Sequence, residues 1–176
     1  MRNEVYVNEK SWVTGSKDIE TDRYDDFSST SAVTNEYGEV VASLRTTDSM
    51  YDWLAEDCFN EVFKPHIKYL RVPGNKEVSR LCIDKDYRNN ILGNQVSVLD
   101  FLTPGILLEN SNNGIRGFVV VTHTTLYVLF KINGMKITML SKFEKMADGC
   151  KIAVFYIDVE ESIRTFRPLK YIEHLE

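Results

Sequence analysis

The chain has 176 residues, of which 43% are hydrophobic and 27% are charged. Such a length and balance predict one globular domain with a substantial core, and they leave too little chain for two. The formal net charge of −5 argues against nucleic acid as the main partner, because phosphate binding requires a cationic surface. Membrane insertion is not expected either, since no apolar run is long enough to cross a bilayer.

The positions of the cysteines and histidines indicate which cofactors and which cellular compartment to expect. The three cysteines, Cys58, Cys82 and Cys150, are far apart in the sequence, and the three histidines are equally scattered. This spacing predicts neither a disulfide framework nor a metal site. We therefore expect a protein of the reducing cytoplasm that uses no metal or other cofactor.

The hydrophobic pattern predicts, in chain order, a hairpin, a helix, a strand, a helix, a strand, a helix and two strands. These elements are expected over residues 31–46, 50–62, 77–84, 95–108, 117–122, 124–132, 135–141 and 150–159. The hairpin is expected to turn at residues 36–38, Glu-Tyr-Gly. This order predicts a mixed sheet with helices on both sides, in one α/β domain.

Local signals refine this order. Residues 66–70 are expected to form a loop or a short strand, and the Val-Pro-Gly-Asn sequence at residues 72–75 predicts a turn. Pro104 is expected to kink the second helix or to split it in two. Gly134 is well placed to end the third helix.

The predicted strand over residues 77–84 opens with Glu-Val-Ser-Arg, so Glu77 and Arg80 lie three residues apart. Alternation places Val78, Arg80 and Cys82 on one face of this strand and the residues between them on the other. By itself, a glutamate and an arginine at this spacing indicate an ordinary salt bridge.

Other charged motifs precede this strand. Asp22 and Asp25 lie three residues apart in a loop, Arg45 ends an otherwise apolar strand, and Arg2 and Trp12 lie in the polar N-terminal stretch. Taken singly, each charge is explained as a surface residue or as half of a salt bridge. Taken together, the aspartates, the glutamate and the arginines predict a buried charge network, which is expected where a charged substrate binds.

The order and spacing of these motifs resemble those of the acyl-homoserine-lactone synthases, the quorum-sensing autoinducer synthases. The family's opening arginine, aromatic residue and tryptophan are matched by Arg2, Tyr6 and Trp12, with tyrosine in place of the usual phenylalanine. The family's Asp-x-aromatic-Asp, Leu-Arg and Glu-x-Ser-Arg motifs follow in order, and Phe63 falls where the family has a pocket phenylalanine. The residues that match these three motifs are Asp22, Tyr24, Asp25, Leu44, Arg45, Glu77, Ser79 and Arg80. The resemblance runs from Arg2 to about Val159.

This resemblance implies a single three-layer α-β-α domain over residues 1–176, with a mixed, mostly antiparallel sheet similar to that of the GNAT N-acyltransferases. Family members usually carry a further N-terminal helix before the first motif, which this chain is expected to lack. Relatives that use acetyl-CoA hold its pyrophosphate on a glycine-rich loop, whereas residues 88–94 here contain a single displaced glycine. This difference favours acyl carrier protein as the bearer of the acyl chain.

The resemblance also implies a two-step reaction. The amine of S-adenosylmethionine attacks the acyl thioester, and the new amide oxygen then displaces methylthioadenosine and closes a lactone. Asp22 and Asp25 are expected to offset the positive charge of the substrate, and Trp12 is expected to stack on its adenine or face its sulfonium. Arg2 is expected to pair with the substrate carboxylate or with an aspartate, and Tyr6 belongs to the same substrate site.

Glu77 is the candidate general base, acting through a water molecule, or it is a structural partner of Arg45 or Arg80. These two arginines join Glu77 as candidate catalytic residues because they are expected to order the charge network. Backbone N–H groups after Arg80 are the expected donors to the oxyanion.

An acyl slot is expected between the central strands and the helix that follows them, although each candidate is also explained as core. The candidates are Phe63, Leu81, Phe101, Leu102, Val119, Val121, Leu126 and Leu140. Val120 stands where family members that use 3-oxo acyl chains carry threonine, which favours an unsubstituted chain.

Two other functions fit the same motifs. One is an N-acyl amino acid synthase of the same superfamily, and the other is a non-catalytic relative that binds acyl carrier protein or a ligand. The basic residues of the C-terminal third either dock an acidic carrier protein or are solvated surface charges. They are Lys142, Lys145, Lys151, Arg164, Arg167 and Lys170.

Overall fold

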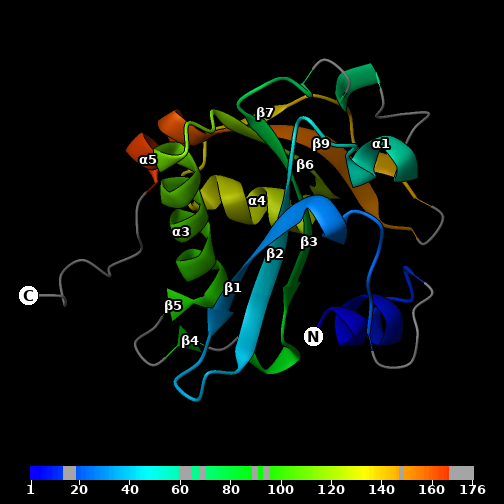
Figure 1. Cartoon of the computed structure of the whole chain (residues 1–176), viewed down its shortest axis with the longest axis vertical. Helices are drawn as coiled ribbons and strands as arrows, with labels where there is room; N and C mark the ends of the chain where they lie inside the picture. The colour runs from blue at the N-terminus through cyan, green and yellow to red at the C-terminus, as the bar shows by residue number, and fades with distance from the viewer. Residues whose placement is uncertain are drawn as a thin grey trace, which may run out of the picture.

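The computed structural model contains one seven-stranded sheet with the strand order β1-β2-β3-β6-β9-β7, in which β8 also pairs with β9 (Figure 1). The structure describes residues 1–13, 19–59, 65–67, 70–88, 91–92, 96–146 and 149–166. The strands of the sheet are β1 (Ser28–Thr34), β2 (Val40–Asp48), β3 (Asn75–Ile83), β6 (Gly117–His123), β7 (Ile137–Met139), β8 (Glu144–Lys145) and β9 (Lys151–Asp158). A separate short pair is formed by β4 (Ile91–Leu92) and β5 (Val96–Ser97).

Helices cover both faces of this sheet. They are α1 (Leu54–Cys58), α3 (Val98–Asn112), α4 (Thr124–Ile132) and α5 (Val159–Thr165), with the π-helix η1 (Glu4–Glu9) and the 3-10 helices η2 (Asp25–Phe27) and η3 (Lys85–Tyr87). In Figure 1, α3 and α5 lie on the left of the strands, and α1 lies on the right. Within the described residues β3 and β6 pair in parallel, while the other pairs are antiparallel. The predicted α/β class, with a mixed and mostly antiparallel sheet, is confirmed. None of the described helices is long and apolar enough to cross a membrane.

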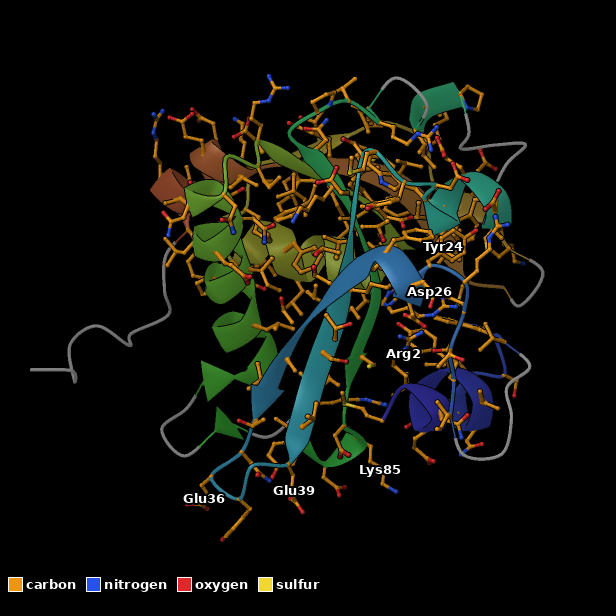
Figure 2. All side chains as sticks on the ribbon, viewed as in Figure 1. Arg2, Tyr24, Asp26, Glu36, Glu39 and Lys85 are labelled. Carbon is orange, nitrogen blue, oxygen red and sulfur yellow. The ribbon has the colours of Figure 1, made fainter. Side chains whose placement is uncertain are left out.

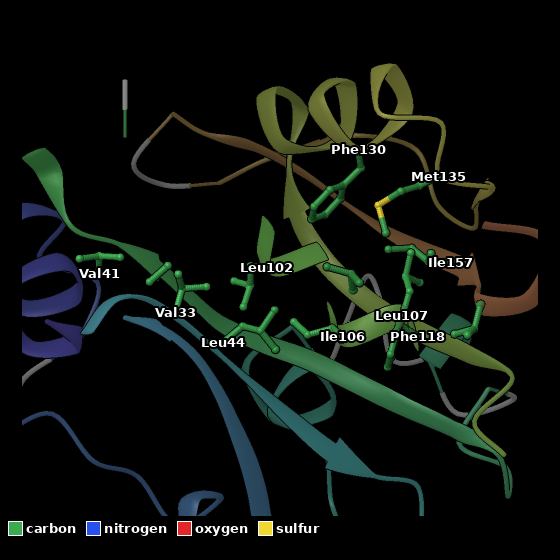
Figure 3. Close-up of a cluster of buried hydrophobic side chains, with 13 residues drawn as sticks. Val33, Val41, Leu44, Leu102, Ile106, Leu107, Phe118, Phe130, Met135 and Ile157 are labelled. Carbon is green, nitrogen blue, oxygen red and sulfur yellow. The ribbon is translucent and has the colours of Figure 1, made fainter. Parts of the chain in front are cut away.

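Alternation along the central strands supplies a hydrophobic core to each face. Phe118 and Val120 of β6 pack with Leu102 and Ile106 of α3 and with Phe130 of α4 (Figure 3). The residue between them points the other way and joins a second cluster under α1. That cluster consists of Trp53, Ala55, Ile67, Val119 and Val154. Alternating side chains of the central strands therefore pack against helices on both faces of the sheet.

Several predicted elements are confirmed. The hairpin forms as β1 and β2, and the strand over 117–122 and the helix over 124–132 form as β6 and α4. The turn over residues 72–75 is closed by a hydrogen bond from the Asn75 N–H to the Val72 carbonyl. Gly134 follows α4 with a φ of 81°, the left-handed conformation that a glycine after a helix adopts readily.

Other elements differ in detail from the predictions, and one helix was not predicted. The helix expected over 50–62 is described only as α1, and residues 65–67 are helical, with Ile67 buried, rather than loop or strand. Pro104 does not split the second helix, because α3 runs through it and buries apolar side chains on either side. The helix α5 was not predicted, although the Asp158 carboxylate accepts the Glu161 N–H in the way an N-cap requires.

A bulge in β3 overturns the predicted alternation of that strand. Arg45 pairs with Ser79 and Ser43 pairs with Cys82, so the two residues Arg80 and Leu81 lie opposite the single residue between Ser43 and Arg45. Arg80 has a φ of 52°, which marks the extra residue of a bulge. Beyond it the faces exchange: Leu81 packs in the α3-side core, and Cys82 packs on the other face with Val5 and Tyr6.

The same region ends the pairing between β3 and β6. Their parallel register runs from Asn75 and Gly117 to Val78 and Val120, although β3 continues to Ile83 and β6 to His123. Beyond Val78, β3 therefore has no partner in β6 within the described register, and the two strands separate next to the bulge.

Two of the left-handed glycines, Gly38 and Gly134, make a matched pair. Their φ angles are 80° and 81°, but a Cβ on Gly134 would lie 2.6 Å from the Thr165 carbonyl oxygen, while nothing lies within 4 Å of one on Gly38. We expect Gly38→Ala to cost about 1 kcal/mol for the backbone conformation alone. Gly134→Ala should cost about 1–3 kcal/mol more, because backbone must move to admit the methyl group. Urea unfolding of both variants measures the difference, and equal losses would contradict the described contact.

Candidate active site

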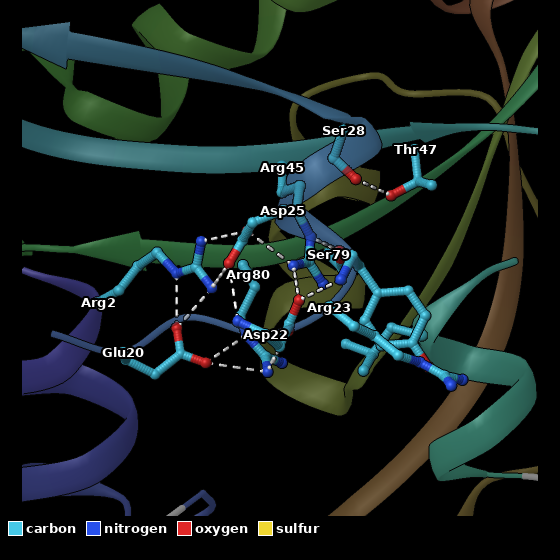
Figure 4. Close-up of polar contacts among 12 residues, drawn as sticks. Arg2, Glu20, Asp22, Arg23, Asp25, Ser28, Arg45, Thr47, Ser79 and Arg80 are labelled. Carbon is cyan, nitrogen blue, oxygen red and sulfur yellow. Dashed lines mark hydrogen bonds and ion pairs between the residues drawn. The ribbon is translucent and has the colours of Figure 1, made fainter. Parts of the chain in front are cut away.

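Six charged side chains form a closed ring in which arginines and carboxylates alternate (Figure 4). In order around this charge ring they are Arg2, Glu20, Arg80, Asp22, Arg45 and Asp25, and the last contacts the first. The ion-pair distance between nitrogen and oxygen is 2.6 Å for Arg2 and Glu20, 3.1 Å for Arg80 and Glu20, and 2.8 Å for Arg80 and Asp22. Since it has three arginines and three carboxylates, the formal charges of the ring cancel.

Four parts of the chain supply the charge ring. Arg45 comes from β2 and Arg80 from the bulge of β3, whereas Arg2 lies just before η1. The carboxylates come from the segment over residues 20–25, which folds on itself before β1. There the Asp22 side chain accepts the Tyr24 N–H at 2.9 Å, and the Asp25 side chain accepts the Asp22 N–H at 2.9 Å. Local turns thus aim the two aspartates at arginines held by the sheet.

Most of this charge is out of contact with solvent. The side chain of Arg45 is 1% exposed, that of Glu20 is 3% exposed and that of Arg80 is 11% exposed. Burial acts to raise the pKa of Asp25, but hydrogen bonds from Arg2, from the Asp22 N–H and from Arg45 outweigh it and hold that pKa well below its usual range. The Nη2 atom of Arg45 is buried and has no hydrogen-bond partner among the described residues.

Two tyrosine rings lie against the arginines. The guanidinium carbon of Arg80 lies 5.3 Å from the centre of the Tyr6 ring, and that of Arg45 lies 5.5 Å from the Tyr24 ring, which are cation–π distances. The Tyr6 hydroxyl donates to the Leu81 carbonyl at 2.7 Å, next to the bulge. Trp12 lies 6.0 Å from Tyr6 and is 47% exposed, so it borders the charge ring at the surface.

Glu77 lies outside the charge ring. It is only 2% exposed, and its two carboxylate oxygens accept the N–H groups of Leu54 at 3.0 Å and Ala55 at 2.7 Å. Among the described residues it makes no ion pair with Arg45 or Arg80; instead it holds the N-terminal end of α1 to β3. Burial raises its pKa to about 7, although the two N–H groups and the nearby charge of Arg45 act to lower it.

Glu77 nevertheless shares a face with the charge ring. It pairs with Thr47 across β2 and with Val119 across β6, and Ser79, two residues on, pairs with Arg45. The Ser79 hydroxyl accepts the Arg45 Nε–H at 3.1 Å. Glu77 and Arg45 are therefore diagonal neighbours on the α1 side of the sheet. A carboxylate with a pKa near 7 is suited to accept a proton at neutral pH.

The remaining predicted residues lie elsewhere or outside the described part. Val120 is 5% exposed and packs in the core on the α3 side, on the opposite face from Glu77, at the last pair before β3 and β6 separate. Phe63 lies outside the described residues, and Phe101 is placed only as part of α3.

Glu20 is the one charge-ring residue that the sequence motifs did not single out. It lies two residues before Asp22, and in an extended segment side chains two apart point to the same side. That spacing was the available signal. Because the sequence does not show that Arg2 and Arg80 are its neighbours, Glu20 could not be distinguished from an ordinary surface glutamate.

A depression of about 550 Å³ lies at the other end of β3 and β6. It is lined by Leu70, Asn75, Ile115, Arg116, Tyr156 and Asp158 among others. Its charged groups already have partners in the fold, because Arg116 donates to the Pro73 carbonyl, Asp158 caps α5 and Glu160 pairs with Arg164. We therefore take the charge ring and Glu77, and not this depression, as the candidate active site.

Comparison with known proteins identifies the family of this chain. The chain matches the family described as autoinducer synthase over residues 1–165. An acyl-homoserine-lactone synthase from Pectobacterium carotovorum subsp. carotovorum is 27% identical over 133 residues, which are 73% of this chain and 60% of that protein. The chain thus aligns with less than two thirds of that relative's length.

Solved structures show the same fold. The CoA-dependent acyl-homoserine lactone synthase BjaI, solved with SAM and isopentyl-CoA, has a TM-score of 0.74 at 19% identity, covering 93% of this chain and 75% of that one. A protein from Lactobacillus plantarum proposed to be an N-acetyltransferase has a TM-score of 0.60 at 15% identity, covering 90% of this chain and 86% of that one. The predicted GNAT-like fold is confirmed. With the family match extending over residues 1–165, the chain belongs to the autoinducer synthase family.

Proposed function

We propose that this chain is an acyl-homoserine-lactone synthase that joins an acyl thioester to S-adenosylmethionine. The observation that carries the proposal is the placement of Glu77, with its raised pKa, on one face with the charge ring and beside the separation of β3 from β6. Family membership supports it, as does the structural relative BjaI, which was solved with SAM and isopentyl-CoA.

In the first step, the substrate amine attacks the thioester carbonyl and the thiol leaves. Glu77 accepts the amine proton through a water molecule. Each carboxylate oxygen of Glu77 accepts one backbone N–H and keeps a second lone pair for that water. In the second step, an oxygen of the substrate's carboxylate attacks the γ-carbon beside the sulfonium, the carbon–sulfur bond breaks, and methylthioadenosine leaves as the lactone closes. The amide oxygen expected from the resemblance is not the nucleophile, because only the carboxylate oxygen closes a lactone ring.

The separated strands provide the site for the acyl group. Backbone N–H groups of β3 beyond Val78 have no β6 partner in register, and they supply donors for the oxyanion of the first step. An acyl chain that enters between the strands passes Val120 and reaches the core on the α3 side. Val120 carries no hydroxyl for a 3-oxo group, which favours an unsubstituted chain.

The charge ring and its aromatic neighbours hold S-adenosylmethionine. Because Asp22 and Asp25 are already paired with arginines, they do not give the site a net negative charge. The rings of Tyr6 and Trp12 lie next to the charge ring, and their faces attract a sulfonium. We place the reaction in the cytoplasm, where Cys58 and Cys82, which form no described disulfide, remain thiols.

We further propose acyl carrier protein as the acyl donor. Lys145 of β8 lies directly opposite Lys151 of β9, and both are exposed, as is Lys142 nearby. Like charges opposite each other weaken a sheet, so the fold alone gives no reason for this pair. An acidic carrier protein would neutralise it. Arg167 and Lys170 of the predicted cluster lie outside the described residues.

The proposed reaction is tested by methylthioadenosine release from S-adenosylmethionine in the presence of acyl-carrier-protein or acyl-CoA thioesters. We expect release with at least one donor, and Glu77→Gln should lower kcat by about 10²–10⁴-fold, the usual contribution of a general base. Glu39→Gln is the matched control, because Glu39 lies at the hairpin end of the molecule, away from Arg2 (Figure 2). Full activity in Glu77→Gln would remove the general-base role, and no release with any donor would contradict the function.

Activity and stability should respond to pH in opposite directions. The pKa of Glu77 is about 7 in the folded protein against an ordinary value of 4.5, so the folded state holds the proton through this range. As pH rises from 4.5 to 7, Glu77 should remove on the order of 3 kcal/mol from the free energy of unfolding, whereas kcat/KM should rise. Urea unfolding and rate measurements over this range test both trends. The pH dependence of the free energy of unfolding and that of kcat/KM should become weaker in Glu77→Gln and stay unchanged in Glu39→Gln. A wild-type kcat/KM that falls over this range would contradict the assignment.

The donor is tested by charge reversal in the exposed lysine pair. The double variant Lys145→Glu and Lys151→Glu should raise the KM for acyl carrier protein about tenfold, the effect of losing one or two interfacial charge contacts. The KM for acyl-CoA should change little, because the smaller donor does not need the protein-docking surface. Lys85→Glu serves as a control at a distant exposed lysine. A higher kcat/KM with acyl-CoA than with acyl carrier protein in the wild type would overturn the donor assignment.

A further inference from the structure

We infer that Glu20 is a positioning residue whose charge keeps the charge ring neutral and so allows a cationic substrate to bind beside it. The inference rests on the proposed function, because it takes the substrate to be S-adenosylmethionine. It concerns a residue that none of the sequence motifs includes.

Glu20 closes the charge ring. Its side chain is 3% exposed and contacts Arg2 at 2.6 Å and Arg80 at 3.1 Å. In the described contacts, the remaining carboxylate partner of Arg2 is Asp25, and that of Arg80 is Asp22. Loss of Glu20 would therefore open the ring into a chain that runs from Arg2 to Arg80. At this burial Glu20 acts through the two arginines and not by touching substrate.

The first consequence concerns charge. With Glu20 ionised, three arginines face three carboxylates, whereas without it one unit of positive charge is left over. Arginine cannot relieve this excess by losing a proton. A ligand with a sulfonium would then be repelled, while the same ligand without the sulfonium charge would not.

The second consequence concerns the bulge. Arg80 has a φ of 52°, a left-handed conformation that costs energy for any residue except glycine. Glu20 and Asp22 hold its guanidinium from two sides, and the Tyr6 ring lies against it. Glu20 thus helps to fix the bulge beside which β3 separates from β6.

The test compares two ligands that differ by one charge. Binding constants are measured at low ionic strength by calorimetry for S-adenosylmethionine and for its neutral thioether analogue, S-adenosylhomocysteine. The ratio of the two affinities cancels any loss of fit that both ligands share. The variants are Glu20→Gln, which leaves the ring with an excess positive charge, and Arg2→Gln, which leaves it with an excess negative charge. Glu9→Gln is the matched control, since it removes a carboxylate that pairs with Arg88 outside the charge ring.

Glu20→Gln should shift the affinity ratio about tenfold against S-adenosylmethionine, the effect of one unit charge at ~12 Å in an effective dielectric constant of ~20. Arg2→Gln should shift it in the opposite direction, and Glu9→Gln should leave it unchanged. If Glu20→Gln does not fold, the shift in Arg2→Gln decides the question. Equal losses for both ligands, or no shift in either variant, would reduce Glu20 to a structural residue and overturn the inference.

Methylthioadenosine release by the wild type is measured in parallel. If the wild type releases it and the affinity ratios do not move, the inference fails and the proposed function stands. If the wild type binds S-adenosylmethionine and the ratios move as expected, but no donor gives release, the inference stands and the proposed reaction fails. If the wild type does not bind S-adenosylmethionine, both are contradicted.

Discussion

Arg45 is buried in the sheet and cannot lose its charge, and the rest of the site is arranged around that constraint. A buried cation of this kind is tolerated only with close anionic partners. Asp22 and Asp25 supply them, and each also takes a second arginine, so the contacts continue through Arg80, Glu20 and Arg2 until the charge ring closes. The charge ring therefore joins the N-terminal segment, the loop before β1 and the two strands β2 and β3.

The charge ring also connects the polar chemistry to the shape of the sheet. Arg80 reaches it from a bulge, and next to that bulge β3 leaves β6. Glu77 lies two residues before Ser79, the residue that pairs with Arg45, and its side chain is on the same face of the sheet as Arg45. Burial raises its pKa to about 7, against the opposing effect of the two N–H groups at the start of α1. One stretch of β3 therefore contributes an arginine to the charge ring, ends the pairing with β6 and carries the proposed proton acceptor.

The sequence was informative where a local pattern determines the structure. The hairpin, β6 and α4 follow from periodicity and turn residues, and the spaced motifs identified Arg2, Asp22, Asp25, Arg45 and Arg80 as a group. The sequence was uninformative where a structural feature depends on residues that are distant in the chain. An alternating pattern cannot show the extra residue at Arg80, and the role of Glu20 depends on an arginine 60 residues away. The amide partners of Glu77 could not be predicted either, because they depend on where α1 begins.

We propose that the charge ring and Glu77 form one substrate site on the α1 face of the sheet. A crystal structure with S-adenosylmethionine bound tests it most directly. We expect the substrate beside the charge ring, with its amine within one bridging water of the Glu77 carboxylate and its sulfonium near Tyr6 or Trp12. Binding in the depression lined by Arg116 and Tyr156, at the other end of β3, would contradict it.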